Sequence, residues 1–117
     1  MASRNLSRPI CITFSNEKGG VGKTSLAVNT ACVLALRGWR VMILDADPQG
    51  HAGLRLGIKK DHGLYDLLVR DADWREVSRR VSPERYGIPG DVLPTESKLW
   101  VVPSNIETRN VAGMVAG

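Results

Sequence analysis

Residues 17–25 read Glu17-Lys18-Gly19-Gly20-Val21-Gly22-Lys23-Thr24-Ser25 and join a short apolar run to a longer one. Three glycines in four positions free the backbone, so that consecutive N–H groups can point into one concavity, which suits an anion. Lys23 would stand in the first turn of a helix, where a cation opposes the helix dipole at a cost of about 0.3–1 kcal/mol. A bound phosphate reverses the sign of that cost, so the stretch predicts a phosphate site.

The flanking runs predict a strand, a helix and a second strand. Residues 10–14 are typical of a buried strand of a parallel sheet, and so are residues 41–44. The helix between them, from about 24 to 37, is apolar nearly all round, which predicts that it is mostly buried, and Gly38 follows as a C-cap. A right-handed crossover would place both strands parallel in one sheet, ending at one edge.

Asp45 and Asp47 directly follow the second strand. At the edge shared with the glycine stretch, two carboxylates can hold a hydrated Mg²⁺ or position a water beside a γ-phosphate. The alternative is a plain turn, which Asp47-Pro48 and Gly50 also favour. The glycine stretch upstream favours the functional interpretation.

The rest of the chain predicts short elements. The sequence favours a polar connector at 54–60 and then a helix at 63–69, with Leu64, Leu67 and Leu68 on one face. Asp73 and Glu76 are expected to cap a further helix, with Trp74, Val77 and Val81 facing inward. A loop at 82–94, a buried strand at 99–102 and the start of another element at 110–117 follow. Such a sheet leaves an unpaired edge, from which we expect the chain to be a fragment of a longer domain.

Composition narrows the class of protein. The 117 residues are 43% hydrophobic and 24% charged, which fits one globular domain and excludes disordered and fibrous proteins. Neither a signal peptide nor a membrane-spanning run is evident. Cys11 and Cys32 are expected to be buried thiols in a reducing cytoplasm; a disulfide or metal pair is less favoured.

Charge is unevenly distributed. Residues 1–60 hold nine Lys or Arg against three Asp or Glu, whereas residues 61–117 hold seven against nine. The cationic excess thus lies in the half that carries the glycine stretch. Nucleic-acid binding is the other interpretation of a basic chain. Residues 66–85, however, hold five arginines and five acids, which indicates a solvated helical face.

The glycine stretch departs from the strict phosphate-loop pattern, which has a glycine where Glu17 stands. It closely resembles the deviant Walker A motif of the ParA/MinD ATPases, in which a second, signature lysine, here Lys18, precedes the glycine pair. Asp45 to Gly50 also matches the ParA-type partition ATPases, and residues 63–68 and 99–105 match them more loosely. The resemblance implies a P-loop NTPase-like α/β fold, a mostly parallel sheet with helices on both faces, of which this chain is the N-terminal part. Residues 1–9 would be a flexible arm and residues 10–117 part of the ATPase domain.

By the same resemblance, the cofactors are ATP and Mg²⁺. The nucleotide-binding residues are those of the motif: Gly19, Gly20, Val21, Gly22, Lys23, Thr24 and Ser25. Lys23 would contact the β- and γ-phosphates, and Lys18 would reach the phosphates of a partner subunit. Thr24 and Asp45 would hold Mg²⁺, and Asp47 would orient the attacking water, so that the catalytic residues are Lys18, Lys23 and Asp47.

The family resemblance also implies partners. These are a second copy in an ATP-sandwich dimer, nonspecific DNA and a ParB-like stimulating protein, with a cytoplasmic, nucleoid-associated location and no membrane. Two other interpretations stay open: a catalytically incomplete nucleotide-binding fragment, and a related MinD-like protein or amidoligase. His51 stands where the family commonly has asparagine, and we expect a solvated histidine there and not a ligand; Glu17 replaces a common glutamine and has no assigned role.

Overall fold

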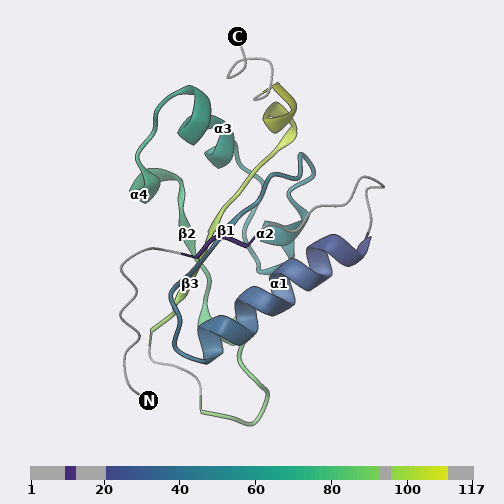
Figure 1. Cartoon of the computed structure of the whole chain (residues 1–117), viewed down its shortest axis with the longest axis vertical. Coiled ribbons are helices and arrows are strands. Elements are labelled where there is room, and N and C mark those ends of the chain that lie inside the picture. Colours follow the sequence, from purple (N-terminus) through teal and green to yellow (C-terminus); the bar gives the residue numbers. More distant parts are fainter. Residues whose placement is uncertain (1–9, 13–20, 93–95, 111–117) are drawn as a thin grey trace.

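A computed structural model of the chain describes residues 10–12, 21–92 and 96–110 (Figure 1). Its helices are α1 (Val21–Leu36), α2 (His51–Arg55), α3 (Gly63–Val69) and α4 (Trp74–Val77). Its strands are β1 (Val41–Leu44), β2 (Arg79–Arg80) and β3 (Leu99–Val102). Two 3₁₀ turns, η1 (Pro83–Arg85) and η2 (Ile106–Asn110), complete the described elements.

The strands form one sheet in the order β1-β3-β2. β1 pairs with β3 in parallel, with Val41 opposite Leu99 and Leu44 opposite Val102. β2 adds a short antiparallel pair on the other side of β3, which the sequence pattern does not predict. The parallel pair and its covering helices confirm the predicted α/β class.

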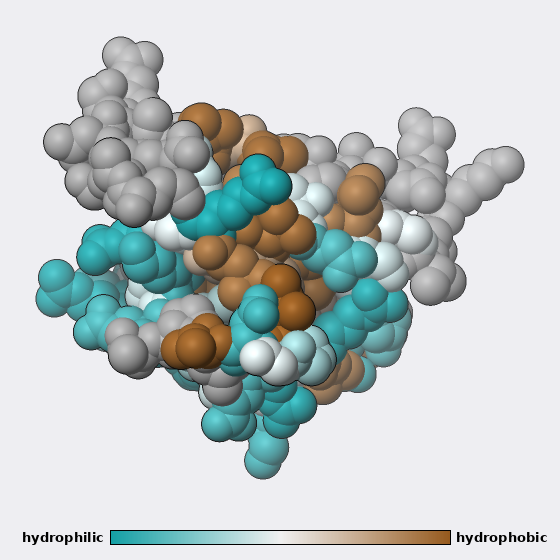
Figure 2. Space-filling view, turned by 90° about the horizontal axis from the view of Figure 1, so that it is seen from below, coloured by the Kyte–Doolittle hydropathy of each residue, from teal (hydrophilic) through white to brown (hydrophobic). Residues whose placement is uncertain are grey.

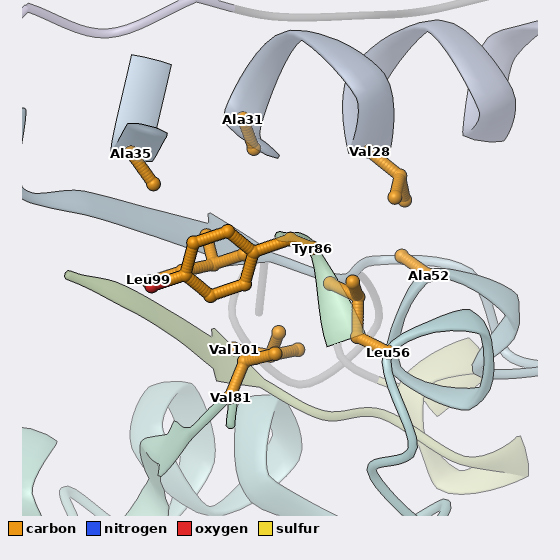
Figure 3. Packing of buried hydrophobic residues seen from close by; sticks show 9 residues of the cluster. All are labelled: Val28, Ala31, Ala35, Ala52, Leu56, Val81, Tyr86, Leu99 and Val101. Carbon is orange, nitrogen blue, oxygen red and sulfur yellow. The ribbon is translucent and has the colours of Figure 1, made fainter. Parts of the chain in front are cut away.

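Helices cover both faces of the sheet at its central strand. On one face, Val28, Ala31 and Ala35 of α1 point toward Leu99 and Val101 of β3 (Figure 3). Because side chains alternate along a strand, Val102 points to the opposite face. There it packs with buried side chains of α3 and α4, namely Leu64 and Val77.

The C-terminal end of α1 is fixed by Gly38, as predicted. Its φ of 95° is a left-handed conformation that favours glycine. The Gly38 amide donates to the Ala35 carbonyl at 3.1 Å and the Trp39 amide to that of Leu34 at 3.1 Å, which is the Schellman pattern. The chain therefore reverses sharply from α1 toward β1.

The expectation that α1 is mostly buried is wrong. Leu26 is 58% exposed and Val33 49% exposed, while Val28, Ala31 and Ala35 on the sheet-facing side are buried. Apolar residues all round a helix do not specify which side will be covered by another element.

Apolar side chains gather in the middle of the face shown in Figure 2, bordered by hydrophilic ones.

The predicted strand at residues 10–14 is not seen in its described part. Residues 10–12 have no regular structure, and Ile10, Cys11 and Ile12 are exposed, so the prediction of a buried Cys11 is also wrong; residues 13 and 14 lie outside the described residues. An apolar run of five residues cannot specify its pairing partner.

β1 alternates between half-buried and exposed positions. The prediction of a fully buried second strand is therefore wrong as well.

Downstream, the helix at 63–69 and the strand at 99–102 are confirmed with the predicted bounds. The connector at 54–60 is partly wrong, because α2 runs into it and Leu56 is buried in the core. Asp73 caps α4 as predicted, through a 2.8 Å bond from the Arg75 amide.

The inward-facing prediction for Trp74 is wrong, because α4 ends after one turn and leaves Trp74 48% exposed. On the predicted apolar face of α3, Leu64 is buried and Leu68 is 51% exposed. The loop at 82–94 is confirmed over its described part, which holds only the 3₁₀ turn η1. Most of the element expected at 110–117 lies outside the described residues.

Candidate functional site

Asp45 lies at the carboxyl end of β1. Its amide donates to the Val102 carbonyl at 3.1 Å, which extends the parallel pairing by one residue and places Asp45 beside the end of β3. The residue is only 4% exposed. Its Oδ1 accepts from the Asp47 amide at 3.0 Å and its Oδ2 from the Gly53 amide at 3.3 Å. The carboxylate is thereby held in one orientation at the sheet edge.

The surroundings of Asp45 disfavour its charge. Burial raises the pKa of Asp45, and the two backbone donors oppose this rise without cancelling it. Neighbouring Asp47 adds to the rise and His51 reduces it. A buried carboxylate with a raised pKa would be stabilised by a bound cation, since opposite charge favours the ionised form.

Asp47 organises the turn that follows. Its Oδ1 accepts from the Gln49 amide at 2.9 Å, and its Oδ2 lies 2.8 Å from Nδ1 of His51. The His51 side chain is 60% exposed, which agrees with the expectation of a solvated histidine. The turn anticipated as the alternative is therefore present, and it presents two carboxylates at the end of β1.

Gly50 allows this turn to pack against the end of β3. Its φ is 65°, and a Cβ at this position would lie 2.9 Å from the Ser104 carbonyl oxygen. Ser104 is fully buried, and its hydroxyl donates to the Asp47 carbonyl oxygen. Sequence reasoning gave Ser104 no role in the site. The signal was its position directly after the strand at 99–102, at the edge where the Asp45 turn also ends.

The N-terminal end of α1 is connected to the Asp45–Gly50 turn by α2, the helix that follows that turn. The Ser25 hydroxyl accepts a 2.7 Å bond from Nη1 of Arg55, the last residue of α2. A Cβ at Gly22 would meet no atom of the described residues within 4 Å, so those residues leave the space beside it open. Arg55 was missed because nothing in the pattern marked an arginine in an expected connector as part of the site.

The predicted site residues thus fall into three groups. Gly22, Thr24, Ser25, Asp45 and Asp47 are described, and the structure brings the two aspartates together and ties Ser25 to α2. Val21 and Lys23 are placed by their backbone in the first turn of α1. Lys18, Gly19 and Gly20, with Glu17, lie outside the described residues.

The oxygen groups present fit a magnesium nucleotide. Within the described ranges, no three His, Cys, Asp or Glu side chains cluster as a ready metal cage. Mg²⁺ does not need such a cage, because it is usually held by one or two carboxylates, waters and substrate phosphates. The buried Asp45 carboxylate supplies one such group, and the described residues leave the space beside Gly22 open to a phosphate. Also within those ranges, no helix has both the length and the hydrophobicity that crossing a membrane requires.

Comparison with known proteins gives the family. A family model described as an AAA domain matches residues 10–114. The chain is 39% identical over 97 residues to the sporulation initiation inhibitor protein Soj of Bacillus subtilis, covering 80% of this chain and 38% of that protein. It is 51% identical over 57 residues to the chromosome-partitioning ATPase Soj of Thermus thermophilus, covering 49% of this chain and 23% of that protein.

A solved structure shares the fold. The cobyrinic acid a,c-diamide synthase of Mycobacterium smegmatis, crystallised with an ATP analog and magnesium, superposes with a TM-score of 0.66 at 25% identity. The match covers 86% of this chain and 36% of that one. The chain therefore spans less than two fifths of the length of each of these three proteins.

The sheet, its covering helices and the turn at its edge define an α/β protein of the P-loop NTPase class. With the family model matching nearly all of its length and Soj proteins among its relatives, the chain belongs to the ParA-like P-loop ATPases.

Proposed function

We propose that this chain carries the phosphate- and magnesium-binding part of a ParA-type ATPase that binds and hydrolyses ATP in chromosome or plasmid partitioning or in cargo positioning. The observation that carries the proposal is the Asp45–Asp47 turn, held at the sheet edge and linked through α2 to the first turn of α1. The neighbouring structure that holds an ATP analog and magnesium supports the same cofactors here.

The phosphates would lie over the backbone of residues 19–25. The ammonium of Lys23 would neutralise the β- and γ-phosphates, and the Ser25 hydroxyl stands in the same helical turn. Thr24 and Asp45 would hold Mg²⁺, which supplies charge neutralisation at the phosphates. Burial of Asp45 suits this role, since it fixes the carboxylate in advance and disfavours its charge until a cation is present.

Asp47 would orient the attacking water. Its carboxylate is an acceptor at the end of β1, and the Gln49 amide and the His51 ring hold its position. In phosphoryl transfer the protein contributes mainly positioning and charge. A carboxylate held by its own turn can accept a hydrogen bond from a water and align it without large movement.

The wider assembly is inferred from the family. Lys18 would complete the site of a second subunit in an ATP-sandwich dimer, nonspecific DNA and a ParB-like protein would be the macromolecular partners, and the location would be the cytoplasm at the nucleoid. Residues 1–9 would form an arm outside the ATPase domain of residues 10–117. The partition role is supported by the name of the Thermus thermophilus relative, a chromosome-partitioning ATPase.

We expect Lys23→Ala and Lys18→Ala, made in the complete polypeptide that carries this sequence, each to abolish ATP-dependent dimerisation. The first removes the ammonium that neutralises the phosphates, and the second removes the contact across the dimer. Size-exclusion chromatography with light scattering, with ATP and without it, measures the effect. Arg75→Ala removes an exposed arginine on α4 and serves as the charge-matched control. Dimerisation that survives both lysine substitutions would show that the site is wrongly assigned.

The structural neighbour favours one alternative, an ATP-dependent amidoligase of the same fold. Such an enzyme uses ATP only when it forms an amide, whereas an ATPase hydrolyses ATP without a second substrate. Measuring ATP turnover with and without a cobyrinic acid and an ammonia donor distinguishes the two. Turnover that requires the acid supports the ligase, and turnover without it supports the ATPase.

A further inference from the structure

Arg55 connects two parts of the molecule that are far apart in sequence. It ends α2, the helix that continues from the Asp47 turn, and its side chain is exposed. Its Nη1 nevertheless donates to the hydroxyl of Ser25, 30 positions away, at 2.7 Å. α2 is held in place by apolar packing, because Ala52 and Leu56 share the core cluster with Val28 of α1 (Figure 3). The guanidinium is therefore presented to the first turn of α1 by a fixed element.

This bond sets the role of the Ser25 hydroxyl. A hydroxyl offers one donor and two acceptor sites, whereas a guanidinium can only donate. Arg55 therefore occupies an acceptor site of Ser25 Oγ and leaves the O–H proton available to donate elsewhere. Hydrogen bonds in a chain polarise one another, so a cationic donor makes that O–H a stronger donor.

The charge of Arg55 also favours an anion at this place. A cation beside the first turn of a helix opposes the helix dipole. Among the residues that the structure describes, no carboxylate forms an ion pair with Arg55. An anion bound at the first turn of α1 would interact favourably with both the guanidinium and the helix terminus.

We propose that Arg55 is a positioning residue for nucleotide binding: it holds the Ser25 hydroxyl so that its proton is donated to a phosphate oxygen of the bound nucleotide. The inference rests on the proposed function. It adds to the site a residue that belongs to α2, so that the helix following the Asp47 turn takes part in phosphate binding.

A double-mutant cycle in the complete polypeptide tests this. The dissociation constant for ATP is measured by fluorescence of a labelled nucleotide for the unsubstituted protein, Arg55→Ala, Ser25→Ala and the double variant. We expect each single substitution to weaken binding about threefold to tenfold, and Arg55→Ala to weaken it by a smaller factor in the Ser25→Ala background than in the unsubstituted protein. Ser25→Thr keeps a hydroxyl and should bind within about twofold of the unsubstituted protein. Arg75→Ala, remote on α4, is the control for the loss of one positive charge.

The melting temperature without nucleotide separates positioning from folding. Because Arg55 is exposed, Arg55→Ala should leave that temperature nearly unchanged. If Arg55→Ala lowered the melting temperature while ATP affinity stayed the same, or weakened ATP binding by the same factor with and without the Ser25 hydroxyl, the inference would be overturned. If the unsubstituted protein bound no ATP at all, the proposed function would fail and this inference with it.

Discussion

At the scale of single residues, the candidate site depends on close backbone contacts as much as on charged side chains. Gly50 shows this most clearly, since its left-handed backbone and its contact with the Ser104 carbonyl both exclude a side chain. That contact brings the Asp47 turn against the end of β3, where the Ser104 hydroxyl binds the Asp47 carbonyl. A local sequence pattern could suggest a turn at Gly50, but it could not show which distant residue the turn would meet.

Gly50→Ala should therefore lower the free energy of unfolding by about 1–3 kcal/mol from backbone strain, with a further loss from the 2.9 Å contact. Gly90→Ala is the matched control, because Gly90 also has a positive φ, 91°, but a Cβ there would meet none of the described atoms within 4 Å. Urea denaturation of both variants measures the difference. Equal losses would show that the close approach of the Ser104 carbonyl adds nothing to the cost of a side chain at position 50.

At the scale of elements, the sequence predicted those whose local signals and packing agree. The helix that became α1 ends at Gly38 because a left-handed residue closes it, and β3 is buried from both sides because helices cover both of its faces. The run at 10–14 carries an equally strong apolar pattern, yet residues 10–12 are exposed. Burial depends on which element lies opposite, and a short pattern does not contain that information.

Cys32 tests how closely α1 packs on the sheet. Burial raises the pKa of this half-buried thiol, so less of it is thiolate at a given pH than for an ordinary cysteine. We expect iodoacetamide to modify Cys32 more slowly than the exposed Cys11 in the folded protein, with the rate rising only at higher pH. Mass spectrometry of the two tryptic peptides gives both rates. In urea the two rates should converge, and equal rates in the folded protein would contradict the packing of α1.

At the scale of the whole molecule, the sequence alone predicted the family, but it did not predict all the residues that contribute to the candidate site. The glycine stretch and Asp45 to Gly50 carry a resemblance that the family model confirms. The roles of Ser104 and Arg55 needed the fold, since Ser104 reaches the Asp47 carbonyl from 57 positions away and Arg55 reaches the Ser25 hydroxyl from 30 positions away. The chain covers 38% or less of the compared proteins. ATP hydrolysis therefore has to be measured both for the 117 residues alone and for the complete polypeptide that carries them.

The 117-residue chain alone should hydrolyse ATP negligibly. By the family resemblance, a second acidic metal-site residue and the adenine-binding segments would come from outside these residues. A phosphate-release assay compares the chain with the complete polypeptide under identical conditions. Steady turnover by the 117 residues alone would overturn this expectation and show that they hold all the catalytic groups.

The central claim is that the Asp45 turn and the first turn of α1 form one site for ATP and Mg²⁺. Its most direct test is the ATP affinity of the complete polypeptide measured by calorimetry with Mg²⁺ and with EDTA, for the unsubstituted protein and Asp45→Asn. Asp91→Asn, which removes an exposed acid in the loop at 82–94, is the control. We predict that Mg²⁺ strengthens ATP binding and that Asp45→Asn reduces this gain about tenfold, as expected when a charged partner is lost. An Mg²⁺-dependent gain that is the same in Asp45→Asn as in the unsubstituted protein would contradict the claim.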